Sequence, residues 1–331
     1  SAGSGPTLGR NCSSLSLNLH STSWLVDCAE GTQIQLQRAS NVTPGRISKV
    51  FITHLHVDHC FGILPFMNTA MSSASNPGKP SRLDNVVRLE FYGPSGLRQM
   101  IRTNLKLTQM SLLGKYAAHE LLFDNEPTFT NEETELHSNE VPGQDIRIGP
   151  DGLWHNIEDS EGFTIDAGPI VHRVTSLGYV FNEKPTFHIG LAYLRMLDDL
   201  NPLILPRGVS RARALLSTLA DNENPQPVTL QDGSIIYPPP RELAGRKLVI
   251  LGDTSDPSAM IPISQDADVL VHESTNAWIP ASLSKNQSTL MTPEEVQAKA
   301  ISRGHATPGM AGQFAATIRA KALYLNHFGV K

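Results

Sequence analysis

A cluster of four potential metal ligands directly follows a short apolar run, and it constrains the fold more than any other segment. The run is Val50-Phe51-Ile52, and the cluster is Thr53-His54-Leu55-His56-Val57-Asp58-His59. The run predicts a β-strand, so the cluster belongs to a loop at the end of that strand. There, His54 and His56 can bind one metal ion while Asp58 and His59 turn toward a second ion nearby. The alternative is a surface loop that is rich in histidine by chance, and four ligands so close together disfavour it.

The composition is that of an ordinary globular protein. The chain has 331 residues, of which 40% are apolar and 18% charged, so it can bury one large core or two ordinary ones. No apolar stretch approaches the roughly 20 residues that span a bilayer, and the N-terminus does not resemble a signal peptide. Three cysteines are too few for a disulfide scaffold, so we expect a reducing compartment, the cytoplasm or the nucleus. The net charge of -5 excludes a surface that is basic throughout.

Strand and helix patterns alternate near both ends of the chain, with irregular segments between them. This order favours one layered α/β domain over residues 1–331. The expected strands are residues 14–19, 23–27, 50–52, 87–92, 178–181, 247–251, 269–272 and 322–326. The expected helices are a segment from residue 32 onward and residues 61–71, 95–105, 292–303 and 308–319. Irregular segments are expected at residues 72–82, 125–160 and 182–241.

The pattern His-x-His-x-Asp-His resembles the signature of the metallo-β-lactamase superfamily, whose members fold as an αββα sandwich. The resemblance implies this fold and further metal ligands downstream. Three residues meet that expectation, because His172 follows an apolar stretch, Asp253 follows an apolar run closely, and His327 ends another such run. Each of them alone would more often be structural. Their order after the cluster favours metal binding.

Four further segments resemble the ribonuclease Z family, the endonucleases that process the 3′ ends of tRNA, and in particular its short form. His305 and His327 are 22 residues apart, a spacing typical of the family, and Ala29 stands where the family usually has glycine. The resemblance covers most of the chain, from Arg10 to Phe328. The four segments are Asp27-Cys28-Ala29-Glu30-Gly31-Thr32-Gln33, residues 51–62, Val271-His272-Glu273-Ser274-Thr275 and Gly304-His305-Ala306-Thr307-Pro308.

The resemblance implies a zinc-dependent endoribonuclease that cleaves the 3′ trailer from precursor tRNA. Two Zn²⁺ ions per chain, or Mn²⁺ or another divalent ion, would activate a hydroxide that attacks the phosphodiester. Asp58 would also accept a proton from the attacking water. His305 would protonate the leaving 3′-oxygen, with Glu273 orienting its imidazole, although both residues could instead be structural. The implied ligands are His54, His56 and His172 for one ion, Asp58, His59 and His327 for the other, and Asp253 as the bridge.

Two features depart from the family pattern. The family begins with an apolar strand and a Gly-Thr-Gly turn that are missing ahead of Ser1, so we expect the native chain to start earlier. The family's substrate-binding arm would correspond to an insertion at residues 182–241, which lacks the usual Gly-Pro-rich tip. Its Arg207, Arg211 and Arg213 could hold tRNA phosphates, and Thr307 is a further candidate contact. A solvated loop with ordinary charges is the alternative.

Three functions therefore stay open at this point. The tRNA endonuclease is the first, and a phosphodiesterase for small substrates such as cyclic nucleotides or aryl phosphodiesters is the second. A catalytically inactive scaffold that binds RNA or protein is the third, and the complete ligand set disfavours it. A basic insertion at residues 182–241 would favour tRNA. The resemblance also implies a homodimer and no membrane contact; residues 61–71 could form the dimer contact, or could equally be a core helix.

Overall fold

The computed structural model describes residues 1–19, 21–72, 82–128, 136–221, 224–240, 242–280 and 291–329. The chain divides into two compact units. Unit 1 comprises residues 1–182 and 247–331, and unit 2 is the inserted segment Glu183–Arg246. Within the described ranges, no helix is long and apolar enough to cross a membrane.

The first sheet of unit 1 is mostly parallel and has seven strands among the described residues. β1 pairs with β2 in antiparallel fashion, whereas β2, β3, β4 and β5 are parallel neighbours in that order. β6 and β7 both pair with β5. The bounds are β1 Leu15–Asn18, β2 Ser23–Val26, β3 Ile47–Phe51, β4 Val87–Pro94, β5 Lys115–Leu122, β6 Glu140–Val141 and β7 Asp145–Arg147.

The second sheet of unit 1 has the strand order β17-β16-β15-β10-β9-β8. β10 is antiparallel to β15, while β15, β16 and β17 are parallel neighbours. The bounds are β8 Trp154–Ser160, β9 Phe163–Ile170, β10 Ser176–Glu183, β15 Lys247–Leu251, β16 Val269–Glu273 and β17 Leu323–Asn326.

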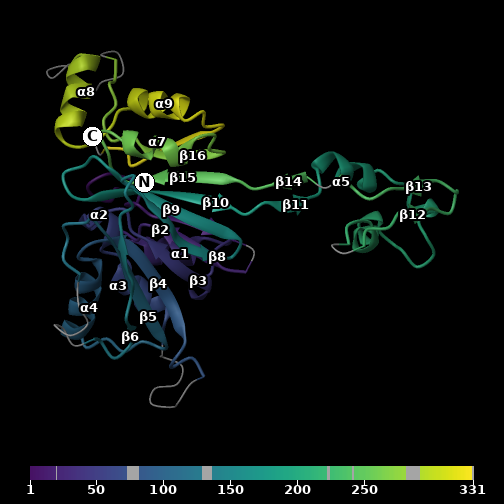
Figure 1. The fold of residues 1–331 in the computed structure, drawn as a ribbon, viewed down its shortest axis with the longest axis horizontal. Helices are drawn as coiled ribbons and strands as arrows, with labels where there is room; N and C mark the ends of the chain where they lie inside the picture. The colour runs from purple at the N-terminus through teal and green to yellow at the C-terminus, as the bar shows by residue number, and fades with distance from the viewer. Residues whose placement is uncertain are drawn as a thin grey trace. The chain divides into compact units, whose positions relative to one another are not determined.

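Helices cover the outer face of each sheet, so unit 1 is a four-layer α-β-β-α sandwich (Figure 1). The first sheet carries α1 (Thr32–Arg38), α3 (Ile63–Ala70) and α4 (Leu97–Leu107), whose apolar side chains share a buried cluster with its strands. The second sheet carries α7 (Ile261–Ser264) and α9 (Pro308–Thr317) in the same way. Figure 1 shows α8 (Pro293–Ser302) on the side of α9.

Alternation along the strands explains how these layers form, because successive side chains point to opposite faces of a sheet. On β3, Val50 packs against the helices while Phe51 faces the second sheet. On β4, Phe91 likewise packs against the helices, while Tyr92 faces the second sheet. Aromatic rings fill the space between the sheets; the ring centroids of Phe51 and Tyr92 are 5.1 Å apart, and those of Phe51 and Phe181 are 5.2 Å apart. Burial of these large rings holds the two sheets together.

Parallel strands deliver polar side chains to one edge of the sandwich. β2 and β3 run in the same direction and are followed closely by Asp27 and His54. β15, β16 and β17 also share one direction, and Asp253, Glu273 and His327 lie at or just beyond their carboxyl ends. Ligand sites in α/β folds usually lie at this end of the strands. The fold therefore gathers residues that are far apart in the sequence.

The strands and helices expected in unit 1 are present, with ends that differ by a few residues. The expectation of an irregular segment at residues 125–160 is wrong in part, because β6, β7 and β8 lie there. β5 and β9 were not expected at all; β5 is rich in alanine, leucine and glutamate, which favour a helix, but it pairs with β4, β6 and β7. The expected irregular segment at residues 72–82 lies almost entirely outside the described residues.

Unit 2 has a small apolar core of its own. Its first and last strands, β11 (Thr186–His188) and β14 (Glu242–Ala244), pair in antiparallel fashion. Between them lie α5 Leu191–Asp198, η2 Pro202–Ile204, η3 Ala212–Leu215, α6 Leu216–Leu219, β12 Val228–Thr229 and β13 Ile235–Ile236. The buried side chains are Leu197, Leu205, Leu215, Leu219, Leu230 and Ile236. The segment expected to be irregular at residues 182–241 therefore contains regular structure.

Candidate metal centre

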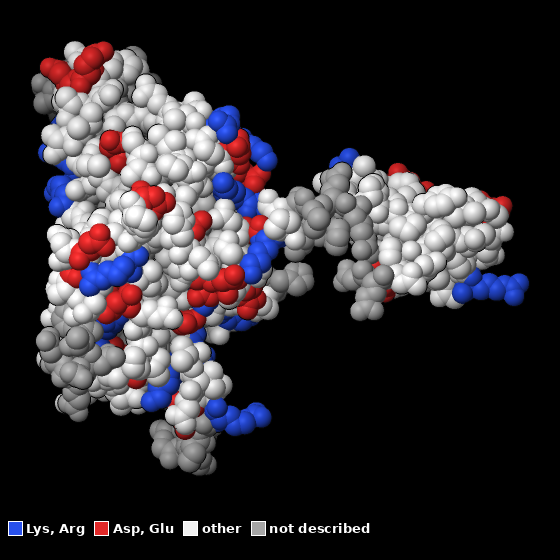
Figure 2. Space-filling view, viewed as in Figure 1, with Lys and Arg blue, Asp and Glu red and all other residues white. Residues whose placement is uncertain are grey.

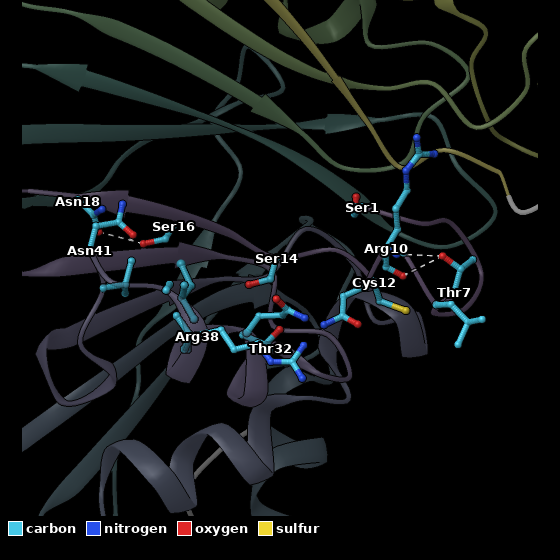
Figure 3. A pocket seen from close by; sticks show the side chains of 18 residues that line it. Ser1, Thr7, Arg10, Cys12, Ser14, Ser16, Asn18, Thr32, Arg38 and Asn41 are labelled. Carbon is cyan, nitrogen blue, oxygen red and sulfur yellow. Dashed lines mark hydrogen bonds between the residues drawn. The ribbon is translucent and has the colours of Figure 1, made fainter.

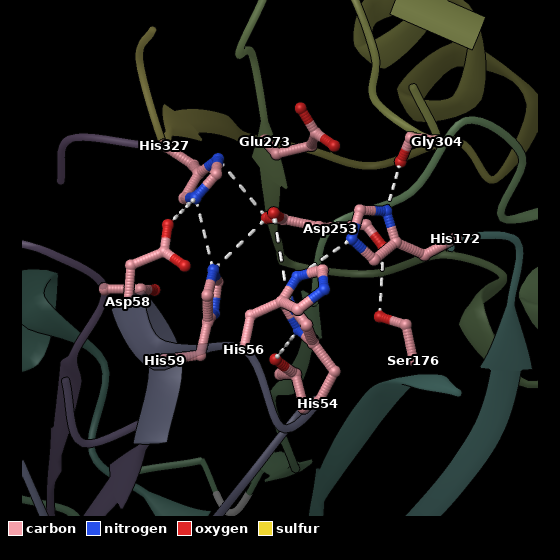
Figure 4. Close-up of polar contacts among 12 residues, drawn as sticks. His54, His56, Asp58, His59, His172, Ser176, Asp253, Glu273, Gly304 and His327 are labelled. Atoms are coloured by element: carbon pink, nitrogen blue, oxygen red, sulfur yellow. Dashed lines mark hydrogen bonds and ion pairs between the residues drawn. The ribbon is translucent and has the colours of Figure 1, made fainter. Parts of the chain in front are cut away.

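The histidine cluster begins where β3 ends and continues into the short helix α2 (Val57–Cys60). His54 is fully buried, and His56 occupies the position before the first residue of α2. Asp58 and His59 lie within α2, so they point in another direction than the two histidines of the loop. The change from loop to helix thus separates the four side chains into two pairs, as Figure 4 shows.

A first group of three nitrogens comes from His54, His56 and His172. His56 Nδ1 lies 3.1 Å from His54 Nε2 and 3.3 Å from His172 Nε2. His172 lies just beyond β9, and its Nδ1 donates a hydrogen bond of 2.6 Å to the carbonyl oxygen of Gly304. That bond fixes the ring so that Nε2 faces the other two histidines.

A second group consists of Asp58, His59 and His327. His327 Nε2 lies 3.2 Å from His59 Nε2 and 3.2 Å from Asp58 Oδ2. Asp58 Oδ2 also accepts a hydrogen bond of 2.6 Å from the backbone N–H of Ser4. The three side chains therefore present one carboxylate oxygen and two imidazole nitrogens to a common point.

Asp253 lies between the two groups and is buried (Figure 4). Its Oδ2 is 3.9 Å from His54 Nε2 in the first group, and its Oδ1 is 3.5 Å from His59 Nε2 in the second. The two oxygens of one carboxylate thus face different groups. This is the geometry that a bridging ligand needs.

Hydrogen bonds on the outer side of the rings determine which nitrogens can bind a metal. His59 Nδ1 donates to Asp27 over 2.6 Å. His327 Nδ1 donates to Thr275 Oγ1 over 2.8 Å, because the Thr275 hydroxyl itself donates to Glu273. In their neutral forms, both rings then carry no proton on Nε2. Two nitrogen lone pairs and a carboxylate oxygen face one another at 3.2 Å, an arrangement that is repulsive without a cation between them.

The first group leads to the same conclusion. Thr53 Oγ1 donates to Asp27 and therefore accepts from Nδ1 of His54 over 3.0 Å, which leaves His54 Nε2 without a proton. A proton on His56 Nδ1 can form a hydrogen bond with either His54 or His172, whereas a metal ion can bind all three nitrogens. Ligands about 2.0–2.1 Å from a tetrahedral zinc ion lie roughly 3.3 Å from one another, close to the distances observed here. The nitrogen and oxygen atoms of the two groups therefore fit zinc as ligands.

Burial and neighbouring groups keep several ligands in forms that a metal can bind; His59 is the exception, since Asp253 and Asp27 raise its pKa although burial opposes this. Burial and the neighbouring His59 hold the pKa of His54 well below its usual value, and burial and His172 lower the pKa of His56. Although burial opposes it, the hydrogen bond with His327 and the nearby His59 hold the pKa of Asp58 below its usual range. Neutral imidazole and ionised carboxylate are the metal-binding forms.

His305 and Glu273 form a separate pair beside the metal ligands. His305 Nδ1 lies 3.0 Å from Glu273 Oε1 and 3.6 Å from Asp253 Oδ2. Glu273 is itself fixed by the backbone N–H groups of Thr254 and Thr275, at 2.9 and 3.1 Å. Burial alone would lower the pKa of His305, but the hydrogen bond to Glu273 and the negative charges of Glu273 and Asp253 raise it above its usual value. The pair is arranged as an acid and the carboxylate that orients it.

The remaining predicted contacts are three arginines of unit 2 and one threonine of unit 1. Arg207, Arg211 and Arg213 are exposed in unit 2, and Arg213 forms an ion pair with Asp198 at 2.6 Å. Thr307 precedes α9 and accepts a hydrogen bond from the N–H of Met310, so its side chain already has a structural role.

Sequence reasoning missed the residues that hold the ligands. Asp27, Thr53 and Thr275 each bind the outer nitrogen of a metal-site histidine, directly or through a hydroxyl, and the carbonyl of Gly304 does the same for His172. The available signal for Asp27 was its place after a strand that precedes the histidine cluster. Only the parallel pairing of β2 and β3 turns that order into proximity.

Comparison with known proteins assigns the chain to a family. Zinc phosphodiesterase ELAC protein 1 of Bos taurus is 33% identical over 337 residues, which cover 98% of this chain and 83% of the relative. The chain belongs to the ribonuclease Z family. A relative named ribonuclease Z, from Nostoc sp., is 30% identical over 98% of this chain and 80% of its own length.

Solved structures of ribonuclease Z family members and of the wider fold agree with this assignment. The short form of human tRNase Z (ELAC1) matches with a TM-score of 0.61 and 26% identity, over 99% of this chain and 90% of that one. YhfI of Bacillus subtilis, a metallo-β-lactamase-fold protein, matches with a TM-score of 0.52 at 17% identity, over 100% of this chain and 84% of that one, and shows the fold alone. The expected αββα metallo-β-lactamase sandwich and the expected family are confirmed.

A family model described as anti-Pycsar protein Apyc1 matches residues 2–84, less than half of this ribonuclease Z family member. That match includes the histidine cluster but none of the later site residues. The zinc in the names of the relatives and the donor set of the site both support the expectation that the chain binds zinc.

Proposed function

We propose that this ribonuclease Z family member is a zinc-dependent endoribonuclease that removes the 3′ trailer from precursor tRNA. One observation carries the proposal: every ligand and acid position that the family resemblance implies is filled, and these side chains converge at one edge of the sandwich. The relatives named ribonuclease Z and zinc phosphodiesterase support the reaction and its metal.

We assign two zinc ions to each chain. His54, His56 and His172 would hold one ion, and Asp58, His59 and His327 would hold the other. Asp253 supports two ions over one because its two oxygens face different groups. Zinc ions bound there would supply an activated water and offset the charge on the phosphate oxygens.

The side chains around the ions would position the substrate and move protons. Asp58 is half-buried and would take a proton from the attacking water. His305 Nδ1 is hydrogen-bonded to Glu273, so Nε2 is the nitrogen that would donate a proton to the leaving 3′-oxygen. Glu273 would hold the ring in place and favour its protonated form.

Unit 2 is the proposed substrate arm, corresponding to the insertion expected at residues 182–241. Three exposed arginines, Arg207, Arg211 and Arg213, support contact with tRNA phosphates, and Thr307 would be a further contact beside the metals. The unit has seven basic and seven acidic residues, and on the face shown in Figure 2 it is mostly uncharged. Such an arm would bind weakly, and its contribution should fall as the salt concentration rises.

We also propose that the chain forms a homodimer through residues 61–71. Phe61 is 57% exposed, and a small apolar cavity beside it is lined by Leu64 and Met100. In α3, Ile63, Phe66, Met67 and Ala70 are buried in the sandwich, so the contact would involve the exposed edge of this helix. A monomer by light scattering at micromolar concentration, with full activity, would contradict the dimer.

Three free, buried cysteines suit a reducing compartment such as the cytoplasm or the nucleus.

The second candidate function is a phosphodiesterase for small substrates, such as cyclic nucleotides or aryl phosphodiesters. The balanced charge of unit 2 favours it, since a tRNA enzyme gains from a basic arm. The two candidates use the same metal centre and differ in the size of the substrate.

One comparison separates them. The zinc-loaded protein is incubated with a precursor tRNA that carries a trailer and with a nitrophenyl phosphodiester, at several salt concentrations. A tRNA endonuclease has a far higher kcat/KM on the precursor, and the advantage shrinks as salt rises. A kcat/KM on the small ester that equals or exceeds the value on the precursor would favour the second candidate.

A further inference from the structure

A second feature of unit 1 is a cleft of about 710 Å³ whose lining includes His305. Its walls come from five places in the sequence: the N-terminal segment, the loop after β9, the segment after β16, α8 with the residues that flank it, and the segment after β17. His305 is the one residue of the cleft that the proposed mechanism uses. Of the rest of its lining, Ser4 and Thr275 contact metal-site residues, and the other residues have no assigned role.

The lining of the cleft is basic. Among the described residues it contains four cations, Arg10, Arg173, Lys299 and Arg303, and neither aspartate nor glutamate. Arg10, Arg173 and Arg303 are exposed, and none of them forms an ion pair within the described part of the chain. Their charges therefore face the cleft without a carboxylate partner, and an anion would be stabilised there.

Three other arginines of unit 1 do form ion pairs. Arg98 pairs with Asp145 at 2.8 Å, Arg102 with Glu140 at 2.7 Å, and Arg319 with Asp266 at 2.8 Å. The positive lining of the cleft does not reflect a basic protein, since the net charge is -5.

Arg10 connects the cleft to an aromatic ring. Its guanidinium carbon lies 4.8 Å from the ring centroid of Phe328, which also lines the cleft. Figure 3, a close view of the neighbouring groove that Arg10 also lines, shows the guanidinium directed away from Thr7 and Cys12. The side chain of Arg10 therefore faces the cleft.

Neutral groups in the lining favour a nucleotide over a bare phosphate. Ser274 Oγ and Asn276 Oδ1 are buried and have no hydrogen-bond partner among the described residues, so both could bind a polar ligand. Ile279, Val296 and Phe328 add an apolar surface. Cations for phosphates beside apolar surface for a base or ribose are the combination that binds single-stranded nucleic acid.

We propose that this cleft binds the nucleotides on the leaving side of the cut, with Arg173 and Arg303 at their backbone phosphates and the apolar surface against the nucleosides. The assignment to the leaving side rests on the proposed function. His305 would protonate the 3′-oxygen that departs, so the strand that carries this oxygen must continue past His305. The cleft is the basic channel that His305 lines.

The test measures binding of two short RNA strands to the zinc-loaded protein by fluorescence anisotropy. One strand begins with a 5′-hydroxyl and ends in a 3′-hydroxyl, like the leaving product; the other begins with a 5′-phosphate, like the trailer, and is blocked at its 3′ end. The variants are Arg173→Ala, Arg303→Ala and the double variant. Arg319→Ala is the matched control, because it removes an exposed arginine that is already paired with Asp266. Thermal melting verifies that each variant is folded.

The double variant should bind the 3′-hydroxyl strand roughly tenfold more weakly, and its log Kd should depend less on log salt, by about 0.7 per lost phosphate contact. Binding of the 5′-phosphate strand should change much less, and Arg319→Ala should resemble the wild type on both strands. An equal loss on both strands, or no loss on either, would overturn the proposal. Cleavage of precursor tRNA by the wild type is measured separately; its absence would refute the proposed function, while the binding results decide the assignment of the cleft.

Discussion

Asp27 accepts a hydrogen bond of 2.6 Å from Nδ1 of His59 and thereby fixes the ring that presents Nε2 to the metal centre. The same carboxylate accepts hydrogen bonds from the backbone N–H and the hydroxyl of Thr53, whose oxygen in turn accepts from His54. One buried acid thus orients a ligand of each metal group. Carboxylates in this position fix the ring orientation and raise the basicity of the ligand.

Replacing Asp27 should therefore weaken zinc binding without unfolding the protein. Asp27→Asn keeps the size of the side chain and one acceptor oxygen but removes the charge, and asparagine tolerates the positive φ of 60° at this position. We expect zinc affinity to fall by roughly 10–100-fold, measured by competition with a chelator. Asp266→Asn, at an exposed position, is the control. Unchanged zinc affinity in Asp27→Asn would show that the ligands are held in place without this charge.

The metal count tests the arrangement of the seven ligands. Native mass spectrometry should find two zinc ions per chain, one ion after His172→Ala or His327→Ala, and fewer than two after Asp253→Asn, because Asp253 faces both groups. Ligand protonation competes with the metal, so the measurement is made near neutral pH with zinc in slight excess. A maximum of one ion in the wild type would contradict the two-ion assignment.

His305 separates proton transfer from metal binding. His305→Ala should retain its zinc and lose roughly 10²–10⁴-fold in rate on precursor tRNA, the usual effect of removing a positioned acid. A nitrophenyl leaving group needs little protonation, so the defect should shrink on a nitrophenyl phosphodiester. His54→Ala should lose metal and activity on both substrates. If His305→Ala loses zinc, or is equally impaired on both substrates, the acid role is wrong.

Glu90 should contribute stability that disappears in acid. It forms an ion pair with the buried Lys49, and His119 Nε2 lies 3.6 Å from its Oε1. The contact with His119 has the largest effect; together with the contact with Lys49 it lowers the pKa of Glu90 from 4.5 to about 2. A carboxyl whose pKa is lower in the folded state stabilises the fold above its unfolded pKa, and this contribution is lost as the pH falls through the folded pKa.

The corresponding variant is Glu90→Gln. It should lower the free energy of unfolding at pH 7 by about 1.5–3 kcal/mol, a typical contribution of a hydrogen bond to a charged group. Below pH 4.5 the difference from the wild type should shrink, and it should vanish near pH 2. Denaturant titrations across this range measure it, with Glu294→Gln at an exposed position as the control. A difference that is constant with pH would mean that the charge of Glu90 does not matter.

The sequence predicts the parts of the site that depend on local order. His54, Asp253 and His327 each follow an apolar strand that is recognisable by itself, so their places at the ends of strands follow from the sequence. The start of α8 is equally local: Thr292 accepts from the N–H of Glu295, and Glu295 caps Thr292 in return. Both features need only a few neighbouring residues.

What the sequence could not predict depends on pairing across the sheets. The composition of β5 favours a helix, because alanine, leucine and glutamate are helix-forming residues. Its pairing with strands on both sides nevertheless makes it a strand. The role of Asp27 follows from the register in which Val26 lies opposite Phe51, and no spacing in the sequence encodes that pairing. The cleft beside His305 likewise exists only once five distant segments meet.

The most direct test of the account is the chemistry of the cut ends. The zinc-loaded protein is incubated with a precursor tRNA, and both products are mapped by mass spectrometry. Departure of a 3′-oxygen protonated by His305 predicts a tRNA that ends in a 3′-hydroxyl and a trailer that begins with a 5′-phosphate, with cleavage abolished by a chelator and restored by zinc. A 2′,3′-cyclic phosphate on the tRNA, cleavage that survives the chelator, or no cleavage of the precursor would contradict the account.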